Sequence, residues 1–266
     1  MKDIIVVRGG GDIATGTIHR LRRCGYPVLV LETKNPAAIR RKVAVCEAVF
    51  DGLVEIEGVV CQRADSFKEA KKIMQADKAA LLVDEQAQVL ELFKPYALVD
   101  GILAKRNLGT NRSMADFTIA LGPGFAAGVD VDCVVETMRG HQLGRLIYEG
   151  QAMPDTGIPG LIQGIGKERV LHAKAAGKIQ NISEISDFVE KGQVIAMIED
   201  VPVRASISGI LRGIIRDGYP VTKGLKIADI APRASEKANC FTISDKARCI
   251  SGGVMEALLA FSGQAR

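Results

Sequence analysis

The pattern of apolar and polar positions at the start of the chain predicts a strand, a tight turn and a helix. A β-branched run, Ile4 to Val7, precedes a glycine-rich turn, and residues 13–23 place apolar side chains at helical spacing. Gly25 and Pro27 end this helix, because glycine readily adopts the left-handed conformation and proline cannot continue a helix. Val28 to Leu31 supplies the next strand, so the chain opens with a right-handed strand-helix-strand unit.

The alternation of elements continues to about residue 100. Residues 37–49 are predicted to form a helix with Arg40 facing water, and Ser66 and Glu69 form a capping-box pattern ahead of another helix. Short apolar runs predict strands at 53–56, 58–60, 79–83 and 96–99. The last of these runs ends at Asp100, and ligands bind at the carboxyl ends of strands in open α/β sheets.

The second half of the chain contains an internal duplication at an offset of 32 residues. The identical pairs are Gly177/Gly209, Ile182/Ile214, Val189/Val221, Lys191/Lys223, Gly192/Gly224, Ile195/Ile227, Ala196/Ala228 and Ile198/Ile230. Each copy alternates apolar and polar positions between short turns, which is typical of strands. Because neither copy can bury a face alone, the two are expected to interleave into one small β-sandwich.

The end of the chain is expected to be helical. Ser244 is a candidate N-cap, and Gly252 and Gly253 interrupt the apolar pattern, so one or two helices should dock on the first domain. We therefore predict a Rossmann-like α/β domain at 1–160, an all-β domain at 161–235 and a helical segment at 236–266.

Composition agrees with this α/β architecture. The chain has 266 residues, enough for about two domains, and aromatic residues make up only 5% with no Trp. A core of Val, Ile, Leu and Ala is typical of parallel sheets covered by helices.

Charge and cysteine content limit the classes of partner. The net charge of +4 is small and charges of both signs alternate, which argues against a nucleic-acid or membrane surface. Six cysteines include no C-x-x-C pair and the three histidines are far apart, so no metal site is predicted. With no leader or spanning segment in the pattern, we expect a cytoplasmic protein. Assembly into a homo-oligomer stays open.

The first turn carries the pattern of a dinucleotide-binding loop. Gly9, Gly11 and Ala14 fit G-x-G-x-x-G/A between a strand and a helix, where the helix N-terminus would hold a pyrophosphate. Glu32 ends the second strand, the position that receives ribose hydroxyls in such folds. The alternative is a glycine turn that serves packing alone.

Several neighbouring residues extend this candidate cofactor site. Gly10 completes the turn, and Arg8 is a candidate to neutralise phosphate charge, although strand ends often carry surface arginines. Thr15 could donate to a phosphate, whereas Asp12 would repel one and could instead cap the helix.

A second candidate site follows Asp100. Asp100, Lys105 and Asn107 place a carboxylate, an amine and an amide just past a predicted strand, a set sufficient for proton transfer or for holding a polar ligand. Solvent contact is the alternative for such loop residues. In the duplicated region, the turn at 199–204 joins the two copies and contains no lysine, so the attachment of biotin or lipoate there is not expected.

Multi-residue blocks spread over the chain resemble the YqeB family, accessory proteins of selenium-dependent molybdenum hydroxylases. The blocks are Arg8 to Gly16, Asp100 to Asn107, Leu121 to Phe125, Glu136 to His141 and Ser251 to Ala257. The duplicated region resembles a biotinyl/lipoyl barrel-sandwich without its lysine, and the family more distantly resembles XdhC-type cofactor chaperones.

The family resemblance implies a role in maturation of a molybdenum hydroxylase client. Because the molybdenum cofactors of bacterial hydroxylases are commonly pterin dinucleotides, molybdopterin dinucleotide or another nucleotide is the expected ligand. Two alternatives remain from the residues: an NAD(P)-dependent oxidoreductase that uses Asp100 and Lys105, and an adaptor without a small ligand.

Overall fold

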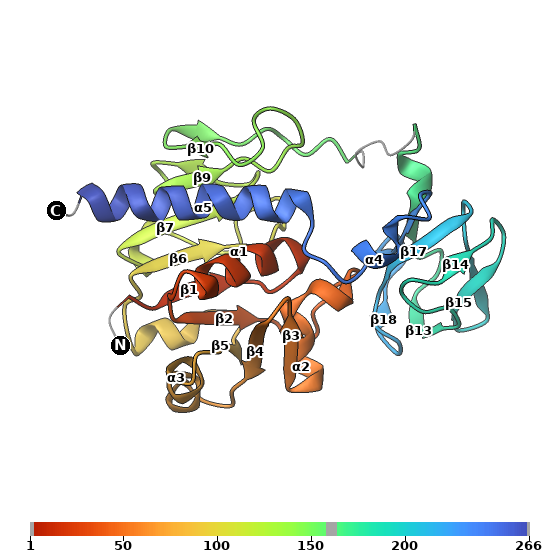
Figure 1. The fold of residues 1–266 in the computed structure, drawn as a ribbon, viewed down its shortest axis with the longest axis horizontal. Helices are drawn as coiled ribbons and strands as arrows, with labels where there is room; N and C mark the ends of the chain where they lie inside the picture. Colours follow the sequence, from red (N-terminus) through yellow and green to blue (C-terminus); the bar gives the residue numbers. More distant parts are fainter. Residues whose placement is uncertain (1–2, 158–163, 265–266) are drawn as a thin grey trace. The chain divides into compact units, whose positions relative to one another are not determined.

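Two structural units, each assembled from separated stretches of sequence, make up the chain (Figure 1). The computed structural model describes residues 3–157 and 164–264. Unit 1 comprises Met1–Pro36, Ala44–Asp155 and Ile243–Arg266, and unit 2 comprises Ala37–Val43 and Thr156–Thr242. The predicted boundary at residues 160 and 161 lies outside the described residues. Of the predicted C-terminal segment, residues 236–242 belong to unit 2 and the remainder to unit 1.

A large mixed sheet forms the centre of unit 1. Its nine strands within the described residues follow the order β10-β9-β7-β6-β1-β2-β5-β4-β3. Their bounds are β1 Ile5–Arg8, β2 Val28–Glu32, β3 Leu53–Ile56, β4 Val59–Arg63, β5 Ala79–Val83, β6 Ala97–Asp100, β7 Phe117–Leu121, β9 Cys133–Val135 and β10 Leu146–Ile147. The outer pairs β3–β4 and β9–β10 are antiparallel, and the pairs between them are parallel. A small separate sheet pairs β8 Ala126–Ala127 with β11 Gly150–Gln151.

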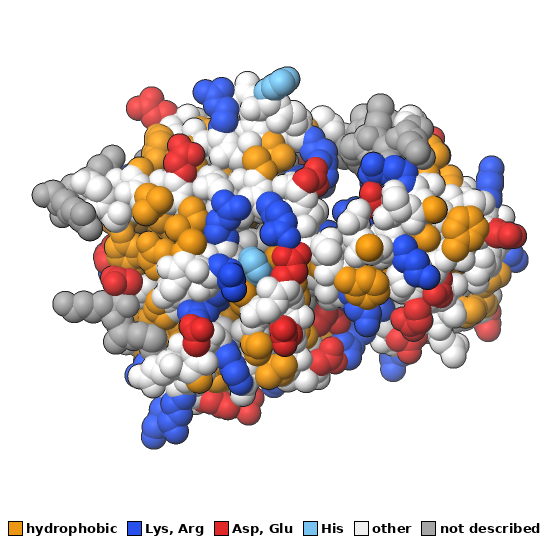
Figure 2. Space-filling model, in the orientation of Figure 1, with side chains coloured by type: hydrophobic (Ala, Val, Ile, Leu, Met, Phe, Trp, Pro, Cys, Tyr) orange, Lys and Arg blue, Asp and Glu red, His pale blue; other side chains and the backbone are white. Residues whose placement is uncertain are grey.

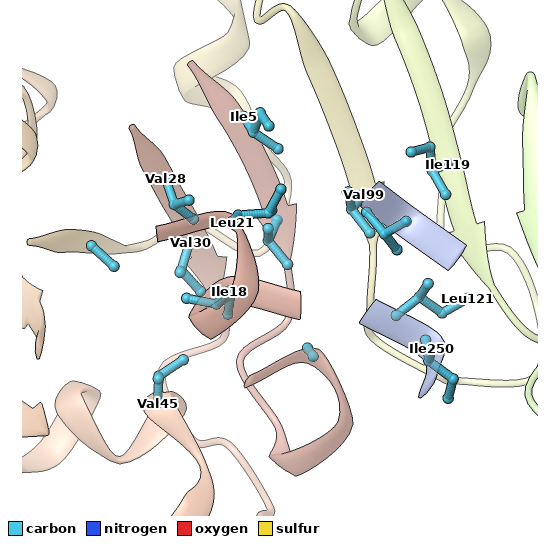
Figure 3. Packing of buried hydrophobic residues seen from close by; sticks show 14 of the residues in the cluster. Ile5, Ile18, Leu21, Val28, Val30, Val45, Val99, Ile119, Leu121 and Ile250 are labelled. Carbon is cyan, nitrogen blue, oxygen red and sulfur yellow. The ribbon is translucent and has the colours of Figure 1, made fainter. Parts of the chain in front are cut away.

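Helices cover both faces of the large sheet, which explains the continuous apolar runs of its central strands. Successive strand side chains point to opposite faces, so Ile5 packs in one core with Ile18, while Val6 packs in another with Ile73. Figure 3 shows Ile18 of α1 and Ile250 of α5 among the strand residues of the first core. The covering helices are α1 Asp12–Arg23 and α5 Asp245–Gln264 on one face and α3 Phe67–Gln75 on the other.

Glycine allows α1 and α5 to pack very closely. A Cβ built on Gly16 would lie 2.8 Å from the Ala247 Cβ, and one built on Gly252 would lie 3.2 Å from Arg20. The earlier residue of α1, Gly16, lies next to the earlier residue of α5, Ala247, and the later residue Arg20 lies next to Gly252. The two helices therefore run in the same direction. The expectation that Gly252 and Gly253 interrupt the helix is wrong, because α5 continues through both; Gly253 instead leaves room for the carbonyl oxygen of Gly144.

The predicted helix at 37–49 is also wrong. The chain there forms short turns: η1 Arg41–Val43, η2 Val45–Glu47 and α2 Ala48–Asp51. The amides of Val45 and Cys46 donate to Thr15 Oγ1 and to the Gly10 carbonyl, at 3.0 and 2.9 Å, so tertiary partners replace the helical ones. Arg40 is buried, and its guanidinium donates to carbonyl oxygens of unit 2 at Asn239 and Thr242. The remaining short helices are η3 Gln88–Glu91, η4 Arg112–Met114, η5 Lys167–Arg169 and α4 Glu236–Asn239.

Local capping signals in the sequence are confirmed. The amide of Glu69 donates to Ser66 Oγ at 3.2 Å, which caps the helix, and the Glu69 carboxylate accepts the amide of Asp65, the residue before the N-cap. Ser244 accepts the Ala247 amide at 3.2 Å and so begins α5.

Unit 2 contains two four-stranded sheets around one apolar core. Their strand orders are β12-β19-β17-β14 and β16-β15-β13-β18. The bounds are β12 Val170–His172, β13 Gly177–Asn181, β14 Phe188–Val189, β15 Val194–Ile198, β16 Val201–Arg204, β17 Gly209–Ile214, β18 Pro220–Val221 and β19 Lys226–Ala231.

The two sequence copies exchange strands in unit 2. The offset of 32 residues places β13 on β17, β14 on β18 and β15 on β19, and it also places β12 on β16. Each copy pairs with the other: β14 with β17, β13 with β18, β12 with β19 and β15 with β16. Neither copy is complete alone, because each sheet contains strands of both.

Candidate functional site

Loops that follow four neighbouring parallel strands, β9, β7, β6 and β1, meet at one edge of the large sheet. Their backbones are in direct contact where glycines lie. A Cβ on Gly9 would lie 3.0 Å from the Ile102 backbone, and one on Gly124 would lie 2.5 Å from the Arg106 amide. This is the carboxyl edge of the parallel strands, where α/β folds hold ligands.

The three glycines of the first turn have different surroundings. Gly9 has a φ of +89° and needs glycine for that reason, whereas Gly10 is buried beneath Cys46. Gly11 has extended backbone, and a Cβ built on it would meet nothing within 4 Å. No side chain caps α1 at Gly11. The open part of the turn is therefore at Gly11.

Glu32 closes the other side of this turn. Its Oε2 accepts the Gly10 amide at 2.7 Å and its Oε1 accepts the Thr33 amide at 2.8 Å. Burial raises the pKa of Glu32, and the two amide hydrogen bonds act in the opposite direction. The expected role with ribose hydroxyls does not match this geometry, because the carboxylate points into the turn and holds it.

Thr15 and Ala14 also belong to the framework of the turn. The Thr15 hydroxyl donates to the carbonyl oxygens of Gly10 and Gly11 at 3.2 and 2.9 Å and accepts the Val45 amide. It is 1% exposed, which leaves it no access to the phosphate that the sequence assigned to it. Ala14 packs against Gly101. Asp12 lies half-buried in the first turn of α1.

Arg8 and Asp100 form one buried network with Thr110. Arg8 donates to Thr110 Oγ1 at 2.6 Å, and the same hydroxyl donates to Asp100 Oδ2 at 2.6 Å. Arg8 and Asp100 are 4% and 2% exposed, so neither reaches a ligand at the edge. Burial raises the pKa of Asp100, against the hydrogen bonds from Thr110 and Ile102 and the charge of Arg8. The network fixes the loop at 101–110.

Asn107 and Lys105 lie on the same loop and bind different partners. Asn107 Oδ1 accepts the amides of Gly109 and Thr110, and its Nδ2 donates to the Thr110 carbonyl. Lys105 is exposed and pairs with Asp155 at 2.5 Å. Asp100, Lys105 and Asn107 thus lie on one loop but serve different partners, and no catalytic group forms among them.

The sequence pattern did not indicate Lys246 as a site residue. It stands half-buried on the first turn of α5, and its ammonium makes no ion pair within the described chain. Burial lowers the pKa of Lys246, and the charge of Arg139 lowers it further, while Asp12, Asp155 and Glu136 act oppositely. Because α1 and α5 pack closely near their N-termini, Lys246 shares an environment with Asp12. Only the docking of α5 brings it there, and no local pattern indicates that contact.

Arg139 and Glu136 border the same region. Arg139 pairs with Asp245 at 2.8 Å. Glu136 is buried, and its carboxylate accepts the amides of Thr137, Met138 and Met153. Glu136 therefore shapes the loop after β9, and Asp245 balances the charge of Arg139.

The surface offers no single-sign patch on the face in view. Figure 2 shows Lys and Arg side chains interspersed with Asp and Glu there. No helix in residues 3–157 and 164–264 is both long and apolar enough to span a bilayer.

The chain is a mixed α/β protein: the central strands of its large sheet are parallel, and a helix lies at its carboxyl end. The chain is 46% identical over 261 residues to the uncharacterized protein YqeB of Escherichia coli (strain K12), covering 98% of this chain and 48% of that protein. This identity is a similarity to YqeB over nearly the whole of this chain. The chain spans about half the length of that relative, and no family model matches it.

Similarity to solved structures is low. The ectoine utilization protein EutE (DoeB) from Ruegeria pomeroyi in its product-bound form is 14% identical, with 86% of this chain and 57% of that chain covered and a TM-score of 0.23. A succinylglutamate desuccinylase from Silicibacter sp. TM1040 is 12% identical, with 86% and 84% covered and a TM-score of 0.26.

Proposed function

We propose that this chain is a cytoplasmic accessory factor for the maturation of selenium-dependent molybdenum hydroxylases, and that unit 1 binds a dinucleotide-like anion. The resemblance of the sequence blocks to the YqeB family supports the process, and the carboxyl edge of a Rossmann-like sheet supports the ligand class. Molybdopterin dinucleotide is the expected ligand and the client hydroxylase the expected partner.

One observation carries the ligand proposal: Gly11, at the amino end of α1, has open space at its Cβ position and no side chain caps the helix there. The first amides of a helix have no intrahelical partner and carry partial positive charge. An anion at this point would accept these amides and also neutralise Lys246. Binding there would favour the charged form of Lys246, which burial alone disfavours.

The site proposed here is smaller than the sequence pattern suggests. The Glu32 carboxylate already accepts the hydrogen bond from the Gly10 amide, and residues 45–46 pack over Gly10. The pyrophosphate would therefore rest against Gly11, with Lys246 of α5 as the nearby cation, and Glu32 would hold the turn in shape from behind.

Unit 2 would serve the client. We assign it to the barrel-sandwich type of biotinyl/lipoyl domains, on the support of the strand exchange between its two copies. Glu199 and Asp200 form the hairpin tip between the copies, so the tip carries no acceptor lysine. A surface for the client is the remaining role.

Equilibrium binding of molybdopterin dinucleotide, NAD and ATP tests the proposal. Gly11→Glu should abolish binding, because it adds negative charge in open space, while Gly11→Ala should retain the fold and most of the affinity. Lys246→Gln should weaken binding about ten-fold or more, the usual value of a charge-assisted hydrogen bond. Lys68→Gln, an exposed lysine on α3, is the matched control. Failure of all three compounds to bind the unaltered protein would overturn the ligand proposal.

A ligand-free adaptor is the second candidate, and the closed state of Gly10 favours it. In that case the turn serves packing alone, and Gly11→Glu should leave hydroxylase maturation in cells unchanged. The ligand proposal requires that the same variant lose maturation activity while its thermal stability stays near that of the parent.

A further inference from the structure

Unit 2 contains a cavity of about 380 Å³ whose walls come from both copies of the duplication. β12 and β16 occupy equivalent positions in the two copies, and each is the edge strand of its sheet. Leu171 of β12 and Val203 of β16 both line the cavity, and the offset of 32 residues relates them to each other. The cavity therefore lies at the seam between the copies.

The floor of the cavity is apolar. Leu171, Ile198 and Val203 line it and are at most 8% exposed, and Val201 extends the apolar surface toward solvent. The volume falls within the range of small-molecule sites, about 300–1,000 Å³. An apolar ligand body would gain favourable burial here.

Basic side chains border this floor. Lys174, Lys191 and Arg204 line the cavity, and none of its lining residues is acidic. Arg204 is held at the rim because it donates to the Gly192 carbonyl at 3.0 Å. Within the described chain none of the three makes an ion pair. Glu199, at the tip of the hairpin between β15 and β16, accepts the Lys178 amide at 2.8 Å.

We propose that this cavity binds a small monocarboxylate with an apolar body. The body would lie on Leu171 and Val203, and the carboxylate would pair with Arg204 and Lys191. Like charges around one cavity repel each other, and a bound anion removes that cost while the apolar floor selects against small inorganic ions. The site lies within unit 2 and is independent of the nucleotide-type site proposed for unit 1.

Calorimetric titration of the full chain with 4-phenylbutyrate, 4-phenylbutanol and acetate tests the proposal. 4-Phenylbutyrate should bind at least ten-fold more tightly than the alcohol, which lacks the charge, and more tightly than acetate, which lacks the apolar body. Equal binding of the acid and the alcohol, or no binding of 4-phenylbutyrate, would overturn the proposal.

Variants locate the binding. Arg204→Gln combined with Lys191→Gln should weaken 4-phenylbutyrate binding about ten-fold and leave the alcohol unaffected. Lys223→Gln is the matched control, because Lys223 is the equivalent of Lys191 in the other copy and does not line the cavity. Val201→Trp gives a second readout: the chain has no other tryptophan, so its fluorescence should change on binding. Equal loss of affinity in the control and the double variant would contradict the assignment.

Discussion

The carboxylate of Glu32 accepts the backbone amide of Gly10 at 2.7 Å, across the turn that a dinucleotide-binding fingerprint would leave open. The acid at the end of the second strand and the glycine turn therefore belong together, as the sequence pattern implied, but they bind each other. The consequence for ligand binding is that Gly11, and not Gly10, presents the accessible backbone.

Removal of the Glu32 carboxylate should destabilise unit 1. Glu32→Ala leaves the buried Gly10 amide without its acceptor, which costs about 1–3 kcal/mol of unfolding free energy. Urea denaturation measures this loss. Glu55→Ala, at an exposed position on the edge strand β3, should change stability by less than about 0.5 kcal/mol. Equal effects of the two changes would show that the Glu32 contact is unimportant.

The raised pKa of Glu32 should appear in the pH dependence of stability. Burial raises its pKa above the usual 4.5, so the folded protein binds the proton more tightly than the unfolded chain. The unfolding free energy should therefore fall as pH rises from about 4.5 through the folded pKa. Glu32→Gln cannot ionise and should show a flatter dependence between pH 4 and 7. Parallel curves for the two proteins would contradict this assignment.

The buried hydroxyl of Thr110 should contribute more to the unfolding free energy than the buried hydroxyl of Thr17. Thr110→Val removes the link between Arg8 and Asp100 and leaves two charged groups short of a partner, at a cost of about 1–3 kcal/mol. Thr17 is equally buried, but its hydroxyl has no hydrogen-bond partner in the described chain. Thr17→Val should be neutral or stabilising. Chemical denaturation of both variants checks the difference, and a loss of similar size in both would refute it.

The close contact between α1 and α5 should make Gly16 intolerant of a side chain. Gly16→Ala introduces a Cβ 2.8 Å from the Cβ and carbonyl oxygen of Ala247, so it should cost about 1–3 kcal/mol despite the better helix propensity of alanine. Gly263 lies in the last turn of α5 with nothing near its Cβ position. Gly263→Ala should stabilise the protein slightly, by up to about 1 kcal/mol. Thermal unfolding measures both, and a stabilising Gly16→Ala would show that the helices pack less closely.

Local patterns were sufficient to predict much of the secondary structure. The strands at 53–56 and 79–83 and the caps at Ser66 and Ser244 follow from nearest-neighbour chemistry, and the structure confirms them. The helix predicted at 37–49 failed because the amides of Val45 and Cys46 find tertiary acceptors at the first turn. Periodicity reports which residues prefer a helix, and it does not include partners that are distant in sequence.

For the candidate site, the tertiary structure gives several residues a different role from the predicted one. Arg8, Asp100, Glu32 and Thr15 are buried, and each supports a loop. Lys246 carries no local signal, because its position depends on the docking of α5 against α1.

The sequence alone determined several strands, the first helix, the caps at Ser66 and Ser244 and the duplication within residues 177–230, because these depend on local periodicity and identity. The tertiary structure decided which polar groups are buried and which stay open. That distinction arises from contacts between segments far apart in the chain, such as the Cys46 amide with Gly10 and Ala247 with Gly16, which no spacing rule contains.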